Sequence, residues 1–169
     1  TPDGNSDLDF SSDSLEMARD IFVSMKGEAL KGKPLLLAQL MNTPYVDPNS
    51  QERTKGHVLG ITTEESVCLL RTSDLVTVHD EESMFYGVEE EHPRRLARGF
   101  FRTMYFSENS VYSVRANTNG SGIMGVPDTI RGASKWAVYD RQKMGFMYWD
   151  ELNGRFLFVN SNGVVSVYE

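Results

Sequence analysis

The sequence predicts a mainly β protein, an antiparallel β-sandwich, jelly roll or barrel with about two short amphipathic helices. Short runs of valine, leucine, threonine and aromatic residues recur from His57 onward, and polar residues separate them. This rhythm is typical of antiparallel strands. Two other segments space their apolar residues as a helix does. Asn162-Gly163 stands between the last two apolar runs and is typical of a two-residue hairpin turn.

Length and composition indicate one globular domain. The chain has 169 residues, of which 40% are hydrophobic and 24% charged. We expect a flexible acidic arm over residues 1–12 and a single β-rich domain over 13–169. The polar start does not resemble a signal peptide, and no apolar stretch approaches the roughly 18 residues that a membrane helix needs. The first residue is Thr1 rather than Met, so we expect that something before it was removed or trimmed.

The first helix is expected over residues 14–26. Apolar residues there fall on one side of a helical wheel and charged residues on the other. Asp13 stands three residues before Glu16, which is the spacing of a capping box. Gly27 is expected to end the helix.

The second helix is expected over residues 93–105. Leu96, Phe100 and Met104 share one face of the wheel, and Pro93 suits the first helical turn. Gly99 is the one residue that disfavours this helix, by about 1 kcal/mol relative to alanine. The opposite face would carry four arginines: Arg94, Arg95, Arg98 and Arg102.

Most other elements are expected to be strands. Residues 33–41 are compatible with either a short helix or a buried strand, and residues 117–132 are expected to form a long loop. The predicted strands cover residues 57–62, 66–71, 75–79, 84–88, 111–116, 135–139, 145–149, 155–160 and 164–168.

The sequence contains no recognisable catalytic, metal or cofactor motif. Its single cysteine, Cys68, lies in an apolar run and is interpreted as a core thiol. His57, His79 and His92 fall on different predicted elements, outside any nucleophile or zinc motif. We therefore expect no cofactor and no metal, and we favour a protein that is not an enzyme. A hydrolase with dispersed catalytic residues remains an alternative, because such sites assemble from distant positions.

The arginine face is the first candidate binding site. Arg94, Arg95, Arg98 and Arg102 are the most concentrated basic feature in a chain of net charge −7. Guanidinium groups pair with carboxylates and phosphates, so the face could contact an acidic protein surface or an RNA backbone. A solvated helix face is the alternative. The negative net charge disfavours DNA binding through overall charge.

The second candidate site is a cluster of aromatic residues in the last third of the chain. Ordinary core packing is one interpretation, and a pocket for a flat apolar ligand is the other. The pocket would be lined by Trp136, Tyr139, Phe146, Tyr148, Trp149, Phe156 and Phe158.

Two sets of segments resemble a known family. Gly27-Glu28-Ala29-Leu30 followed by Pro34-Leu35-Leu36-Leu37 resembles the opening of jelly-roll capsid proteins of picorna-like viruses. The later segments are similar to the short helix and central strand of the same family: His92-Pro93-Arg94-Arg95-Leu96, Phe100-Phe101-Arg102 and Val111-Tyr112-Ser113-Val114-Arg115. The resemblance implies a structural subunit whose work is assembly, without catalytic residues.

We therefore expect a soluble, non-enzymatic structural module, cytoplasmic or virion-like, that self-associates or binds another protein and does not insert in a membrane. A β-barrel that binds a small apolar or aromatic ligand is the first alternative. The dispersed hydrolase is the second.

Overall fold

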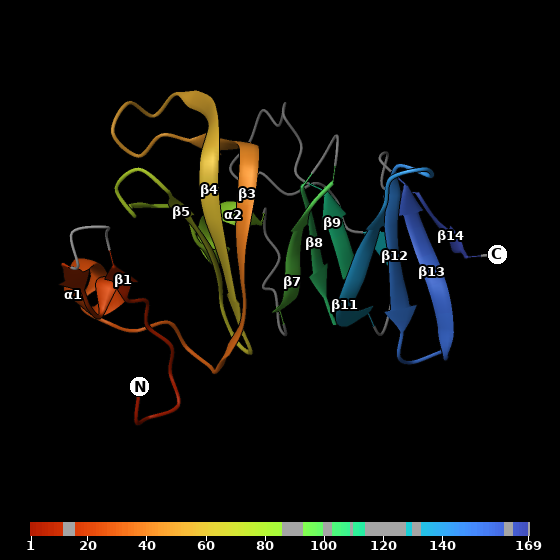
Figure 1. The fold of residues 1–169 in the computed structure, drawn as a ribbon, viewed down its shortest axis with the longest axis horizontal. Coiled ribbons are helices and arrows are strands. Elements are labelled where there is room, and N and C mark those ends of the chain that lie inside the picture. The colour runs from red at the N-terminus through yellow and green to blue at the C-terminus, as the bar shows by residue number, and fades with distance from the viewer. Residues whose placement is uncertain are drawn as a thin grey trace.

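The protein folds as a stack of antiparallel sheets (Figure 1). The computed structural model describes residues 1–11, 16–85, 93–99, 103–108, 110–113, 128–129, 133–160 and 164–168. Within these residues, three four-stranded sheets follow one another along the chain, and a two-stranded sheet precedes them. The predicted mainly β, sandwich-like class is confirmed, and none of the described sheets closes into a barrel.

The first sheet begins with the segment whose secondary structure the sequence left open. Residues 34–41 of this segment belong to a long strand rather than a helix. Pro34 is its first residue, a position where a missing N–H is tolerated. The strands lie in the order β3 (Pro34–Val46), β4 (Arg53–Thr63), β5 (Val67–Arg71) and β6 (Thr77–His79).

The predicted helix over residues 93–105 is wrong. The described residues of this segment form strands of the second sheet instead. Leu96 pairs with Tyr105, and Ala97 pairs with Met104, in an antiparallel ladder between two strands. The sheet contains β7 (Pro93–Arg98), β8 (Thr103–Ser107), β9 (Ser110–Ser113) and β10 (Asp128–Thr129).

The cause of this error is burial on both faces of the second sheet. Successive residues of a strand point to opposite faces. Leu96 and Tyr105 pack in a core cluster with the first sheet, whereas Ala97 and Met104 pack in a cluster with the third. A strand buried on both sides carries consecutive apolar residues, and these also fit the apolar side of a helical wheel.

The third sheet contains the predicted pairing of the last two strands, which is confirmed, but the register leaves three residues between Asn160 and Val164 rather than the predicted two-residue turn. Leu157 pairs with Val167, and Val159 pairs with Val165. Gly163 lies outside the described residues, so its expected positive φ stays a prediction. The strands lie in the order β11 (Ala133–Asp140), β12 (Gly145–Asp150), β13 (Arg155–Asn160) and β14 (Val165–Val167).

The first helix is shorter than predicted. Helix α1 (Ile21–Lys26) follows a small hairpin of β1 (Phe10–Ser11) and β2 (Met17–Ala18). The carboxylate of Asp7 accepts the N–H groups of Phe22 and Val23, at 2.8 and 3.1 Å, so it satisfies the helix start in place of the expected capping box. Gly27 ends the helix at φ 85°, as predicted.

A second helix occupies part of a predicted strand. Helix α2 (Glu81–Met84) begins with a capping box in which the Asp80 carboxylate accepts the Ser83 N–H. Met84 was expected to begin the strand over residues 84–88, but it ends this helix. In the part of the chain that the structure describes, neither helix is long and apolar enough to cross a membrane.

The core divides into three clusters, one on each side of the second sheet and one beyond the first. The third cluster lies on the outer side of the first sheet, where Phe22 packs with Ile61, Cys68 and Leu70. Leu8 and Leu30 pack against the same cluster. The N-terminal segment, expected to be an arm, therefore covers part of the outer side of the first sheet.

Candidate functional site

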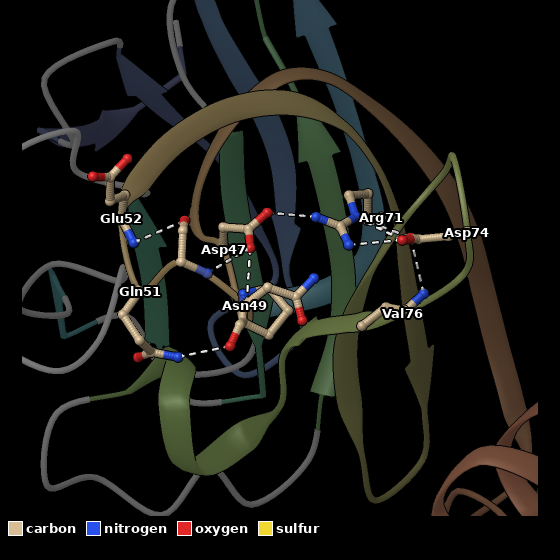
Figure 2. A network of polar contacts seen from close by, with 9 residues as sticks. Asp47, Asn49, Gln51, Glu52, Arg71, Asp74 and Val76 are labelled. Carbon is tan, nitrogen blue, oxygen red and sulfur yellow. Dashed lines mark hydrogen bonds and ion pairs between the residues drawn. The ribbon is translucent and has the colours of Figure 1, made fainter.

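An ion-pair network joins two loops at the edge of the first sheet (Figure 2). Arg71 donates from Nη1 to the carboxylate of Asp47, and from Nη2 and Nε to that of Asp74 at 2.7 and 2.9 Å. The carboxylate of Asp47 also accepts the N–H groups of Asn49 and Ser50. Every charged group of this network is committed to a partner within the chain, so the network holds the loops together.

The pKa shifts in this network agree with a structural role. Hydrogen bonding to Asp74 raises the pKa of Arg71. The Arg71 guanidinium in turn lowers the pKa of Asp74. The backbone N–H groups of Asn49 and Ser50 lower the pKa of Asp47. Each shift favours the charged form, which keeps the three side chains paired at neutral pH.

His79 lies beside a serine and a carboxylate, but its hydrogen bonds prevent it from accepting the proton of the serine hydroxyl. The Val46 N–H donates to Nε2 at 3.3 Å, so the ring proton resides on Nδ1 and is donated to Ser83 Oγ at 3.2 Å. Ser83 in turn donates to the Asp80 carboxylate at 2.9 Å. Burial lowers the pKa of His79 to about 4. A histidine that donates to a serine cannot also take the serine's proton.

Cys68 is buried, as the sequence predicted. Burial raises the pKa of its thiol to about 12, so the nucleophilic thiolate is not formed at neutral pH. Among the described residues, no group of three His, Cys, Asp or Glu side chains is placed to hold a metal ion.

The arginines do not form the helical face that the sequence predicted. Arg94, Arg95 and Arg98 lie on strand β7, and Arg102 is outside the described residues. Arg95 and Arg98 are three positions apart on this strand, so they point to opposite faces of the sheet. Both are half-buried, and burial lowers the pKa of each. Partner binding through these arginines stays a prediction.

The seven predicted aromatic residues divide between the two faces of the third sheet. Tyr139, Phe146 and Tyr148 pack in the core cluster against the second sheet. The Phe106 ring of that sheet lies 5.7 Å from the Phe146 ring and 5.4 Å from the Tyr148 ring, measured between centroids. The other four point away from the stack: Trp136, Trp149, Phe156 and Phe158. The seven side chains therefore do not line one pocket.

The outward side of the third sheet carries a cluster of apolar side chains, which we call the outer face. Val138 pairs with Met147, Met147 with Phe158, and Trp149 with Phe156, so these side chains share one side of the sheet. The outer face comprises Trp136, Val138, Met147, Trp149, Phe156, Phe158 and Tyr168.

Several members of the outer face are strongly exposed. The exposed fractions are 66% for Trp136, 62% for Val138 and 50% for Phe156. Because large apolar side chains rarely gather on solvated surfaces without a partner, this exposure marks the outer face as the strongest candidate binding surface.

Contacts within the outer face hold its side chains in place. The Trp149 and Phe156 rings meet edge to face with centroids 4.8 Å apart. The Phe158 ring lies over Gly145, where an added Cβ would stand 2.4 Å from Phe158 Cζ. Lys143 Nζ lies 4.1 Å from the centre of the Tyr168 ring. Several side chains of the outer face thus pack against one another.

Comparison with protein families and with curated proteins gives no match to this chain. The function is therefore argued from the surface and the polar clusters themselves. Sequence reasoning identified the aromatic residues but not their division into two sets. The signal that separates them is their alternation along β11, β12 and β13, read together with the strand register.

Proposed function

We propose that this chain is a non-enzymatic assembly module that acts by self-association. The outer face carries the proposal, because it exposes aromatic and aliphatic side chains together on one side of a sheet. Such surfaces are typical of protein interaction sites, where burial of apolar area drives binding.

The polar clusters support a structural role. Arg71 is committed to Asp47 and Asp74, and His79 is committed to the Val46 N–H and Ser83. Catalysis by a serine needs a base that can accept its proton. The direction inferred for the His79 hydrogen bonds favours a role in fixing strand β6 against helix α2 instead.

The resemblance to jelly-roll capsid proteins of picorna-like viruses suggests a larger version of the same function. In that version, many copies would form a closed shell, and the arginines of β7 would contact an acidic partner or RNA. The two versions differ in particle size, which can be measured directly.

Sedimentation velocity of the full chain tests the proposal. We expect a concentration-dependent association that persists as salt rises, because apolar burial is not screened. Association through the arginines would weaken with salt instead. A chain that stays monomeric at every concentration and salt would contradict the proposed function.

A further inference from the structure

We infer that the outer face binds the outer face of a second copy of this chain, so that two stacks join in a closed two-fold dimer. The inference rests on the self-association through the outer face proposed above, and it adds the face-to-face arrangement and the stoichiometry.

The residue pattern of the third sheet is that of a sheet covered on both sides. Residues 146–149 and 156–159 are apolar at every position. The same pattern occurs in strand β8 at Met104, Tyr105 and Phe106, and that strand is buried on both faces. A sheet with one solvated face alternates apolar and polar residues instead. The third sheet therefore has the composition of a sheet that is covered on both faces, but the described residues cover only its inner face.

The opposite end of the stack differs in a way that selects the arrangement. There, Leu8, Phe22 and Leu30 pack over part of the outer side of the first sheet, whereas Leu37 on the same side is 55% exposed. In head-to-tail stacking, the outer face of one copy would have to meet this partly covered side of the next copy. Face-to-face pairing uses the same patch on both copies, and it closes after two.

The size of the outer face sets the strength expected. Its four strands contain 8, 6, 6 and 3 residues. At about 4.8 Å between strands and about 3.3 Å per residue, the whole sheet measures roughly 19 by 20 Å, or about 400 Å² in projection. Two such sheets face to face give about 800 Å² in projection, less than the about 1,200–2,000 Å² that stable specific interfaces bury. We therefore expect a weak dimer that forms and dissociates with protein concentration.

The decisive experiment compares two double variants with the parent chain by sedimentation velocity, from about 1 to 200 µM. Val138→Lys with Phe156→Lys places charge on the outer face at side chains that are 62% and 50% exposed. Leu37→Lys with Met41→Lys is the matched control, since these residues of β3 are 55% and 58% exposed. We expect the first pair to raise the dissociation constant at least tenfold and the control pair to leave it unchanged.

Crosslinking provides a second measurement that does not depend on the charged variants. Cys68 is 1% exposed, so Val138→Cys adds the one readily accessible thiol of the folded chain. A long, flexible bis-maleimide should then link Val138→Cys chains into dimers. It should link Met41→Cys chains much less. Equal crosslinking of the two variants would overturn the inference even if the lysine variants failed to fold.

The outcomes separate this inference from the proposed function. If the parent dimerises and the outer-face variant dimerises equally well, the chosen surface is wrong, and self-association still stands. Particles larger than a dimer would likewise overturn the closed arrangement and leave self-association in place. A parent chain that is monomeric throughout would overturn both.

Discussion

Replacement of Gly99 by alanine distinguishes the observed strand from the helix that the sequence predicted, because the two structures predict opposite changes in the free energy of unfolding. Gly99 is buried directly after β7, next to the core between the second and third sheets. A Cβ built at this position would lie 2.8 Å from Tyr139 Cε2 and 3.0 Å from Phe146 Cε2. Carbon atoms in contact normally stand about 3.5–4.0 Å apart. The two rings, whose centroids are 5.1 Å apart, would have to move.

The expected cost follows from this overlap. An extra methyl group in a filled core destabilises a protein by about 1–3 kcal/mol. For a chain of this length, that corresponds to a fall of about 2–12 °C in the midpoint of thermal unfolding. In a helix over residues 93–105, the same change would instead increase the free energy of unfolding by about 1 kcal/mol. Urea and thermal unfolding of Gly99→Ala measure the difference.

A double-mutant cycle identifies the contact responsible. Tyr139→Ala removes one of the two rings over Gly99, so Gly99→Ala should cost less in that background by more than about 0.5 kcal/mol. The reasoning is refuted if Gly99→Ala stabilises the chain. It is also refuted if the cost is the same with and without the Tyr139 ring.

Two further predictions concern the polar clusters. Because the pKa of His79 is about 4 in the fold and about 6.5 when unfolded, the unfolded chain binds the proton first, and stability should fall as the pH drops from 6.5 to 4 by up to about 3 kcal/mol. His79→Gln should flatten this dependence in urea titrations; an unchanged slope would contradict it. Arg71→Lys should lower the thermal midpoint, because an ammonium cannot span both Asp47 and Asp74 as the guanidinium does. A midpoint equal to the parent's would show that the network is dispensable.

The strands were predictable from sequence wherever apolar runs and turn residues occur together. The pairing of the last two strands is the clearest case, because each strand is short and the turn-forming residues Asn162 and Gly163 stand between them in the sequence. The segment over 93–105 was not predictable in the same way. Its apolar residues face two different sheets, and periodicity within one segment does not record which neighbour each residue meets.

The candidate site was predictable as a set of residues but not as a surface. Trp136, Phe156 and Phe158 were identified with the other aromatics, yet only the strand register shows that they share the outward side. The arginines show the opposite case, in which residues predicted to share one face do not share it. They are close in sequence, but Arg95 and Arg98 are separated by the sheet because they lie on a strand.

The three four-stranded sheets have the same kind of strand order, so they differ in their faces and not in their topology. Every described four-stranded sheet pairs strands that are neighbours in the sequence, so strand order alone does not distinguish one sheet from another. The sheets differ in how many of their faces are apolar and how many are covered. The second sheet has two apolar faces between two neighbours, and the first has a neighbour on one side and the N-terminal segment on the other. The third sheet has two apolar faces and one neighbour within the described chain. The third sheet thus has one more apolar face than the described chain covers, and this difference is the physical basis for assigning a partner to the outer face.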